Sequence, residues 1–458
     1  MIKTKLFAGK TFLILGMGIT GNSLAESLLN SGAKVFFWDD DKNIRSSIKK
    51  NLYLLFNDKI NQWNQVNFVI PSPGIHINGI NSNKLIKKAK KYKLKIISEL
   101  DLFQLYINQQ KKIKKNNIRV IAITGTNGKS TVVSLIHHML KSNKHNSSLI
   151  GNIGKSIFKS KPITNGFYII EVSSYQLESS KIFSPDVAAI VNFSQDHLAR
   201  HKTIKNYLNQ KIKIFRSLNK NSLAIVNNNH HLLKKVSTDI IRSKLFNVSI
   251  FNFRLGIKKS FNSQSKISKK ILIREIKLNN FSLQGYHNQE NVQIAIHALQ
   301  HFNLNRKNLI HSIIKFKGLP HRQELVYKNK NIQIINDSKA TNLESMIPAL
   351  KTFKKIFLIC GGELKDKNIS ILDPYKKRIK KVYVTGKNKD VFKKYFSKSH
   401  NLFYSSSMNQ IIKNILSDTK DSKDITILFC PGAASFDQYK NFEERGDNFK
   451  KIIGKYYK

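Results

Sequence analysis

Short apolar runs alternate along this chain with polar stretches rich in helix-forming residues. Thr11–Leu15 and Lys34–Trp38 have the length and composition of strands, and a glycine turn followed by a leucine-rich helical pattern lies between them. Val66–Ile70 continues the alternation up to a Pro-Ser-Pro-Gly turn. Such a strand–helix–strand order predicts a parallel sheet with ligands at the carboxyl ends of its strands.

The alternation begins again twice further along the chain. A polar, lysine-rich stretch, Asn108–Asn117, predicts a linker. After it, strands are predicted at Arg119–Thr124, Tyr168–Val172 and Val187–Asn192. A third series, starting near Gly318, has predicted strands at Ile332–Asn336, Ile356–Cys360, Lys381–Thr385 and Ile425–Cys430. The sequence therefore predicts three α/β units in series.

Composition narrows the class of protein. The 79 Lys+Arg against 28 Asp+Glu give a net charge of +51, but 41% hydrophobic residues are too many for a disordered basic tail. The basic runs are scattered over the whole length, which favours a surface bias over a dedicated nucleic-acid partner. The apolar runs are far shorter than the ~20 residues of a membrane span, and the N-terminal one leads into a glycine turn, not a cleavage site. We expect a cytoplasmic, monomeric globular protein in which Cys360 and Cys430 are buried structural thiols.

The first glycine turn, Gly16–Gly21, matches GxGxxG between a strand and a helix, and Asp39 ends the next strand. Glycines in such a turn let backbone N–H groups approach a diphosphate at the helix N-terminus. Alone, the pattern would fit a nicotinamide enzyme or a turn needed only for helix–sheet packing. It identifies a diphosphate-binding turn better than it identifies the ligand.

A second glycine loop, Thr124–Thr131, lies between a predicted strand and a helix predicted at Val132–Leu140. It is shorter than the full GxxxxGK[ST] pattern, because Ile123 stands where the first glycine would be. Its N–H groups would cradle phosphates, its lysine would reach the β- and γ-phosphates of ATP, and a hydroxyl would ligate Mg²⁺. The predicted ATP-binding residues of this loop are Gly125, Thr126, Asn127, Gly128, Lys129, Ser130 and Thr131.

This loop resembles the ATP loop of the Mur ligases, the ATP-dependent amide-bond ligases of peptidoglycan synthesis. Further motifs follow in the order of that family: Gly151–Gly154, Glu171–Glu178, Asp196-His197, His287-Asn288 with Asn291, Gly318–Glu324, Asn336–Asn342 and Ser435–Gly446. The last two are typical of the branch that adds D-glutamate. The resemblance implies a Rossmann-like domain for a UDP-linked substrate over residues 1–110. It also implies a central P-loop ATPase-like domain with a parallel sheet over 111–317, and a Rossmann-like amino-acid-binding domain over 318–458.

The reaction that the resemblance implies uses UDP-N-acetylmuramoyl-L-alanine, D-glutamate and ATP. A carboxylate takes the γ-phosphoryl group of ATP to become an acyl phosphate, and an amine then displaces phosphate. A ligase of the same family with another amino acid is the alternative. A nucleic-acid-binding ATPase and a nicotinamide oxidoreductase are rivals from other classes, and the second leaves the ATP loop unexplained.

The implied catalytic residues are Lys129, Glu171, His197 and Lys211, and the implied Mg²⁺ ligands are Ser130, Glu171, His197 and a carbamylated Lys211. Two features of the sequence complicate this assignment. In a chain this rich in lysine, Lys211 also fits an ordinary solvated lysine, and Lys213 is only two residues away. Gln195 stands where close relatives often have Glu, which lowers the negative charge expected at a second metal site.

The resemblance also assigns residues to the three substrates. Further ATP contacts would come from Asn291, at the start of a helix predicted at Asn291–Leu299, and from Arg322 and Asp337, so closure of the third domain would complete the site. The UDP-linked substrate would contact Ile19, Thr20, Asp39, Ser72, Gly74, Asn152 and His197. D-glutamate would contact Lys339, Thr341, Lys365, Ser435 and Phe442.

Two of these substrate sites depart from the family pattern. Close relatives often have Arg two positions after the acid of Asp39, but this chain reads Asp39-Asp40-Asp41-Lys42. Either Lys42 takes that role or the uracil is held differently. The loop Glu363–Asp366 that carries Lys365 has a bulkier middle than is common.

Overall fold

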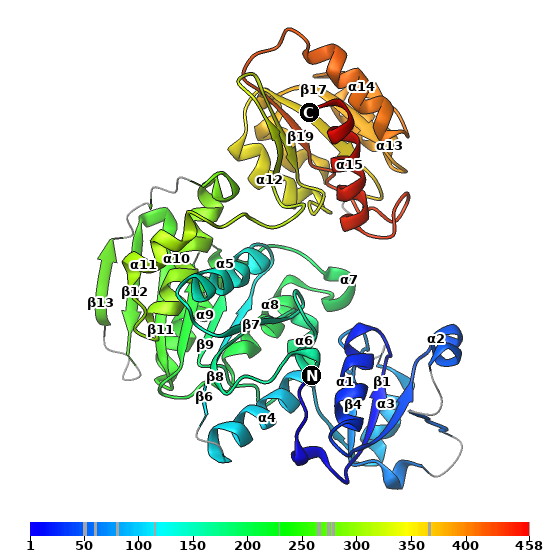
Figure 1. Ribbon diagram of the computed structural model, residues 1–458, viewed down its shortest axis with the longest axis vertical. Coiled ribbons are helices and arrows are strands. Elements are labelled where there is room, and N and C mark those ends of the chain that lie inside the picture. The colour runs from blue at the N-terminus through cyan, green and yellow to red at the C-terminus, as the bar shows by residue number, and fades with distance from the viewer. Residues whose placement is uncertain are drawn as a thin grey trace. The chain divides into compact units, whose positions relative to one another are not determined.

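The computed structural model is an α/β protein (Figure 1). It describes residues 1–48, 53–58, 62–78, 82–113, 116–228, 230–262, 267–272, 276, 280–364 and 368–457. The chain divides into two compact units, Met1–Glu275 with Glu290–Ser312, and Ile276–Gln289 with Ile313–Lys458. Among the described residues, no helix is long and apolar enough to cross a membrane.

The first unit begins with a five-stranded, fully parallel sheet of order β3-β2-β1-β4-β5. Its strands are β1 (Thr11–Leu15), β2 (Lys34–Trp38), β3 (Leu54–Leu55), β4 (Phe68–Pro71) and β5 (Lys95–Ile96). Its helices are α1 (Ile19–Leu29), α2 (Lys42–Ser47), α3 (Lys84–Lys91) and α4 (Glu99–Ile113), with the short 3₁₀ helices η1 (Lys5–Phe7) and η2 (Trp63–Gln65). The strand order reverses at β1, so the loops after β1 and β4 face a topological switch point, where parallel sheets bind ligands.

An eight-stranded sheet of order β13-β12-β11-β10-β9-β6-β8-β7 forms the rest of this unit, parallel except for the β11–β12–β13 meander. Its strands are β6 (Asn117–Thr124), β7 (Ser147–Gly151), β8 (Asn165–Glu171), β9 (Val187–Ile190), β10 (Leu223–Asn227), β11 (Asn247–Asn252), β12 (Ile257–Phe261) and β13 (Ile267–Leu272). Its α-helices are α5 (Lys129–Ser142), α6 (Ser174–Ser179), α7 (Leu198–His201), α8 (Ile204–Ile212), α9 (His231–Ser243), α10 (Tyr286–Gln300) and α11 (Arg306–Ile313). Three short 3₁₀ helices are η3 (Ile157–Lys159), η4 (Lys213–Phe215) and η5 (Phe253–Leu255).

One apolar core continues from the first sheet into the second. Phe7 and Phe12 belong to the same cluster of buried side chains as Phe158 and Tyr168, and the rings of Phe7 and Phe158 lie 6.4 Å apart. The backbone N–H of Ile2 also donates to the carbonyl of Phe158 at 2.9 Å. These contacts explain why the two sheets form a single compact unit.

The second unit holds a six-stranded sheet of order β14-β15-β19-β16-β17-β18, in which only the edge strand β14 is antiparallel. Its strands are β14 (Glu324–Lys328), β15 (Ile332–Asn336), β16 (Ile356–Gly361), β17 (Ile379–Thr385), β18 (Asn401–Tyr404) and β19 (Ile425–Phe429). Its helices are α12 (Leu343–Thr352), α13 (Lys389–Phe396), α14 (Met408–Thr419) and α15 (Phe442–Tyr456), with η6 (Phe281–Leu283) and η7 (Ile369–Arg378). Separate apolar clusters, around Leu350 and around Phe449, cover the two faces of this sheet.

Two predictions about elements were wrong. Asn108–Asn117 is not a linker, because α4 continues to Ile113 and β6 begins at Asn117. Lys and Gln are good helix formers, so a polar run extends α4 as readily as it would make a loop. Asn291 does not start a helix, since α10 begins at Tyr286. The predicted α/β fold class is confirmed. The predicted domain boundaries after residues 110 and 317 stay predictions.

Candidate active site

The ATP-loop segment connects β6 to α5 and is held in shape by Asn192, which follows β9. The Asn192 Oδ1 accepts the N–H groups of Thr126 and Asn127 at 3.1 and 2.9 Å, and its Nδ2 donates to the Asn127 carbonyl at 2.8 Å. The Thr126 hydroxyl donates to the Ser194 carbonyl at 3.1 Å. Asn192 and Ser194, which follow β9, therefore hold the backbone of the ATP loop in place through hydrogen bonds. The sequence alone did not indicate this role.

A glycine in the left-handed region, Gly128, caps the N-terminus of α5 with φ of 77°. A Cβ at this position would lie 2.6 Å from the Oδ1 of Asn291. Asn291, in the second turn of α10 and buried, thus lies beside the loop. The structure brings these two predicted ATP contacts together although they come from distant parts of the sequence.

Two lysines donate to one carbonyl oxygen in this loop. The Nζ atoms of Lys129 and Lys211 lie 2.9 and 2.7 Å from the carbonyl oxygen of Gly125. The Nζ of Lys129 also donates to the backbone carbonyl of Thr126 at 2.7 Å. Lys211 is only 1% exposed, and its Nζ lies 4.5 Å from the centre of the Tyr207 ring. Lys211 is therefore not the solvated lysine of the alternative interpretation.

Burial lowers the pKa of Lys211 well below its ordinary value, and the positive charge of Lys129 lowers it further. Asp196 and Glu171 act in the opposite direction through their negative charges. Lys211 thus lies within electrostatic reach of two other predicted site residues, Lys129 and Glu171, and of Asp196 beside His197. A lowered pKa favours the neutral amine, which is the nucleophilic form of lysine.

Glu171 ends β8, next to the strand that leads into the ATP loop. Its Oε1 accepts a hydrogen bond from the Nδ2 of Asn152 at 2.9 Å. Its Oε2 is buried and has no hydrogen-bond partner among the residues that the structure describes. A buried carboxylate oxygen without a donor suits a hard cation such as Mg²⁺, which binds oxygen ligands.

His197 precedes α7 with a left-handed backbone, φ 53°. Its Nδ1 lies 3.1 Å from the hydroxyl of Tyr175, and its Nε2 lies 3.5 Å from the Oδ2 of Asp196. Its ring packs near that of Tyr207, whose hydroxyl lies 3.4 Å from the hydroxyl of Thr126. His197 is therefore connected to the ATP loop through Tyr207. Within the described part of the chain, no group of three or more His, Cys, Asp or Glu side chains forms a metal cluster.

Five of the seven predicted UDP-substrate residues lie at the carboxyl ends of β1, β2 and β4 in the first sheet, whereas Asn152 and His197 belong to the part of the chain that forms the second sheet. The Asp39 carboxylate accepts the N–H groups of Met17 and Asp41 at 2.7 and 3.0 Å. The Ser72 hydroxyl donates to the Gly16 carbonyl at 2.6 Å. Exposed Ile19, half-buried Thr20 and exposed Gly74 lie around these anchored loops. Asp39 and Ser72 thus also shape the glycine turn itself.

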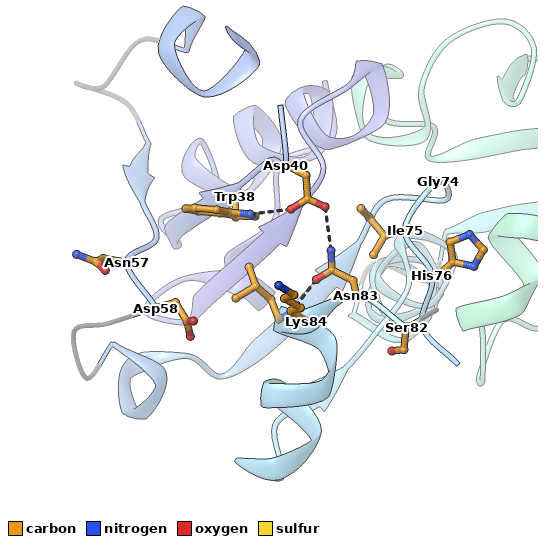
Figure 2. A pocket seen from close by; sticks show the side chains of 11 residues that line it. Trp38, Asp40, Asn57, Asp58, Gly74, Ile75, His76, Ser82, Asn83 and Lys84 are labelled. Carbon is orange, nitrogen blue, oxygen red and sulfur yellow. Dashed lines mark hydrogen bonds between the residues drawn. The ribbon is translucent and has the colours of Figure 1, made fainter. Parts of the chain in front are cut away.

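A pocket of about 760 Å³ opens beside these loops (Figure 2). The Nε1 of Trp38 and the Nδ2 of Asn83 donate to the two carboxylate oxygens of Asp40, at 3.0 and 3.1 Å. Arg45 packs on Trp38 with its guanidinium carbon 4.5 Å from the ring centre, and it donates to the carbonyls of Asp39 and Asp40. Arg45, not the predicted alternative Lys42, is therefore the cation that binds the backbone beside Asp39.

In the second unit, Asp337 follows β15 and is buried. It accepts the N–H of Gln323 at 3.2 Å and the thiol of Cys430 at 3.6 Å. Burial raises its pKa to about 6, while the hydrogen bond from Gln323 and the charge of Arg322 oppose the rise. Both cysteines are buried free thiols, as predicted.

Two of the predicted D-glutamate residues, Lys339 and Phe442, lie together at the start of α15 in the same unit. The Nζ of Lys339 lies 3.9 Å from the centre of the Phe442 ring. Arg445 is buried and donates from Nε and Nη2 to the hydroxyl and carbonyl of Ser338, at 3.0 and 2.8 Å. Ser435 is buried and Thr341 half-buried, whereas Lys365 lies outside the described residues. Arg445 lies in the predicted motif Ser435–Gly446, but the sequence did not indicate that its guanidinium binds Ser338.

Comparison with known proteins decides the family. Residues 123–299 match the Mur ligase middle domain, and residues 321–432 match the Mur ligase, glutamate ligase domain. The UDP-N-acetylmuramoylalanine--D-glutamate ligase of Rickettsia prowazekii is 32% identical over 97% of this chain and 98% of its own length. The chain belongs to the Mur ligase family. The protein of the same name from Caulobacter vibrioides NA1000 is 28% identical over 99% of this Mur ligase and 97% of its own length.

Solved structures show the same fold for this Mur ligase. The MurF ligase of Thermotoga maritima in complex with ADP has a TM-score of 0.58 at 17% identity, covering 99% of this chain and 97% of that one. The UDP-N-acetylmuramate-alanine ligase of the same organism has a TM-score of 0.54 at 16% identity, covering 97% and 99%. The predicted family is therefore confirmed together with its fold.

The first glycine turn of this Mur ligase offers a matched pair of variants. A Cβ on Gly21 would lie 2.0 Å from the Gly16 carbonyl oxygen, whereas one on Gly18 meets no atom within 4 Å. We expect Gly21→Ala to destabilise the first sheet by about 1–3 kcal/mol through overpacking, and Gly18→Ala by less than about 1 kcal/mol. Urea unfolding followed by tryptophan fluorescence reports this sheet, because Trp38 and Trp63 are the chain's two tryptophans. Equal losses in the two variants would contradict the packing argument.

Proposed function

We propose that this Mur ligase joins D-glutamate to UDP-N-acetylmuramoyl-L-alanine at the expense of ATP, in peptidoglycan synthesis. The observation that carries the proposal is the match to a D-glutamate ligase along 97% of the chain. Lys339, a predicted D-glutamate contact, lies inside the segment that matches the glutamate ligase domain. We place the enzyme in the cytoplasm, where its nucleotide substrates are available, and propose that it acts as a monomer.

In the first step, a carboxylate oxygen of the L-alanyl end attacks the γ-phosphorus of ATP. The new O–P bond gives an acyl phosphate, the bond to the bridging oxygen breaks, and ADP leaves. Lys129 would turn from the Gly125 and Thr126 carbonyls to the phosphates and neutralise the charge that develops there. Asn192 holds the N–H groups of the loop in place for the same task.

The residues of the site fit Mg²⁺. Glu171, with its unbonded buried oxygen, and Ser130 at the start of α5 would hold one ion, and His197 with a carbamylated Lys211 would hold a second. When bound, Mg²⁺ supplies positive charge to the phosphate oxygens. The buried, low-pKa amine of Lys211 supports the carbamate, because only a neutral amine adds to CO₂.

In the second step, the amine of D-glutamate attacks the acyl carbon, phosphate leaves, and an amide bond remains. The two carboxylates of D-glutamate need cations and hydroxyl donors. Lys339, Thr341 and Ser435 would supply these groups, with Phe442 as an apolar backing. Lys365, and the ATP contacts predicted from Arg322 and Asp337, stay predictions.

A panel of amino acids tests the proposal. The purified protein is given ATP, Mg²⁺ and UDP-N-acetylmuramoyl-L-alanine with D-glutamate, L-glutamate, L-alanine, L-lysine or diaminopimelate, and phosphate release is measured. We expect D-glutamate to support a rate about 100-fold above that of any other amino acid. L-alanine and L-lysine have one carboxylate and would leave a cation of the site unpaired. L-glutamate and diaminopimelate have two carboxylates, but their configuration or length prevents them from placing both carboxylates and the amine in the same positions. Mass spectrometry of the product should show one added glutamyl residue.

Two controls distinguish the alternatives. Omitting the nucleotide substrate should abolish phosphate release, since the acyl phosphate cannot form. Indifference to D-glutamate, with turnover of another amino acid, would assign the chain to another Mur ligase activity. Stimulation of ATP hydrolysis by DNA or RNA, with a steep dependence on salt, would instead support the nucleic-acid ATPase.

A further inference from the structure

Arg200, in the last turn of α7, is a buried arginine that none of the predicted sites includes. Its side chain is 8% exposed, and that of its partner Glu178 is 12% exposed. The Nε and Nη2 atoms of Arg200 donate to the Oε2 of Glu178 at 3.1 and 2.8 Å. An ion pair this well buried requires precise geometry, because both charges have left water.

The other donors of Arg200 reach the loop after β4. Its Nη1 donates to the Gly74 carbonyl at 2.9 Å, and its Nη2 donates to the Ile75 carbonyl at 2.8 Å. Gly74 and Ile75 line the pocket of the first sheet (Figure 2). Ser72 of the same loop is bonded to the Gly16 carbonyl of the first glycine turn. The guanidinium therefore holds the loop on which the UDP-linked substrate is proposed to rest.

Arg200 is also connected to the reaction centre, through Tyr175 and the short helix that follows His197. It follows His197 by three positions, and its guanidinium carbon lies 5.3 Å from the centre of the Tyr175 ring. The hydroxyl of Tyr175 lies 3.1 Å from the Nδ1 of His197. Tyr175 and Glu178 both belong to α6, which begins three residues after Glu171. Arg200 thus belongs to α7, the short helix that follows His197, and its side chain binds both Glu178 of α6 and the loop after β4.

We propose that Arg200 is a positioning residue that sets the spacing between the nucleotide end and the reacting end of the UDP-linked substrate. The proposal rests on the proposed function. A planar fork of donors can bind a carboxylate and two carbonyls at once, and a lysine ammonium cannot reproduce that arrangement. The long substrate must present its carboxylate to the γ-phosphate while its diphosphate end is held at the first sheet. A shift between the two anchors would therefore lower the rate as well as the affinity.

The test separates the three substrates of the reaction. For Arg200→Lys, we expect the KM for UDP-N-acetylmuramoyl-L-alanine to rise at least about 10-fold and kcat to fall at least about 10-fold. The KM values for ATP and D-glutamate should stay within about 3-fold. Titration with UDP should show weaker binding, whereas titration with ADP should show unchanged affinity. Glu178→Gln, which keeps the acceptor but removes its charge, should shift the same KM in the same direction by a smaller factor.

Lys111→Gln is the matched control, because it removes an ion pair with Asp186, at 3.2 Å, elsewhere in the same unit. It should leave all three KM values unchanged. An unchanged nucleotide KM in Arg200→Lys, or a similar rise of all three KM values, would overturn the proposal. If Arg200→Lys loses its fold by circular dichroism, Glu178→Gln decides between the same outcomes. Failure of the proposed function itself is visible separately, as the absence of D-glutamate-dependent phosphate release by the unaltered enzyme.

Discussion

Replacing Lys129 with alanine is expected to abolish turnover, lowering kcat/KM for ATP by at least about 10³-fold. Its Nζ is already at the centre of the loop, hydrogen-bonded to the carbonyls of Gly125 and Thr126 at 2.9 and 2.7 Å. From there it needs only a side-chain rotation to reach a bound phosphate. Without it, charge builds up on the transferring phosphoryl group with one cation fewer nearby. Phosphate release with all three substrates present measures the loss.

The same helix supplies a matched control for this prediction. Lys141→Ala removes an exposed lysine from the last turn of α5, far along the helix from the loop, and should change the rate less than about 2-fold. The fold of Lys129→Ala should persist, because Asn192 holds the loop through bonds that do not involve the lysine. Retention of a substantial rate by a folded Lys129→Ala variant would refute the ATP-loop assignment.

Local features of the fold were predictable from the sequence. The strands Thr11–Leu15, Lys34–Trp38 and Ile332–Asn336 were predicted with the bounds that the structure shows. A buried strand is a short apolar run between turn residues, and both signals are contained in a few consecutive positions. The ATP loop was predictable for the same reason. Where a polar run fits a helix as well as a loop, as at the end of α4, the local signal is ambiguous and the prediction was wrong.

Contacts between distant segments were not predictable in this way. Asn192 shapes the ATP loop from 65 positions further along the chain, and Arg200 binds carbonyls more than 120 positions before it. An asparagine after a strand and an arginine in a short helix have many possible roles, and only the fold selects one. The only hint that the sequence contained for these two residues was their position next to predicted site elements. Asn192 follows a strand that pairs with β6, and Arg200 lies just after a predicted catalytic histidine.

The role of a single charged residue was equally hard to predict from the sequence. Among 79 basic residues, the sequence could not separate Lys211 from an ordinary surface lysine. In the structure its side chain is buried and its amine binds the ATP loop, while Lys213 donates to the Glu178 carbonyl at 2.9 Å. Burial of an amine is costly unless its charge is lost or compensated. The placement of Lys211 is therefore itself an argument for a chemical role.

Replacing Lys211 with alanine is expected to lower kcat at least about 100-fold, because the carbamate proposed there is lost from beside Glu171. Short-chain carboxylic acids such as formate and acetate should restore part of the rate, since a free carboxylate of that size can occupy the vacated space. The space is closed by Gly125 and the Tyr207 ring, so formate should act better than bulkier acids. Rate against acid concentration, at constant ionic strength, measures the rescue.

Lys213→Ala separates a chemical role from the loss of any lysine in this segment. It removes a lysine two residues away, whose amine binds a carbonyl of α6, and should lower the rate less than about 3-fold without any response to formate. Chloride at equal ionic strength should not rescue Lys211→Ala, because it cannot accept the hydrogen bonds of a carboxylate in the same geometry. Full activity of Lys211→Ala would contradict the assignment. A large loss that no acid relieves would leave Lys211 a buried structural amine and remove the carbamate from the proposed mechanism.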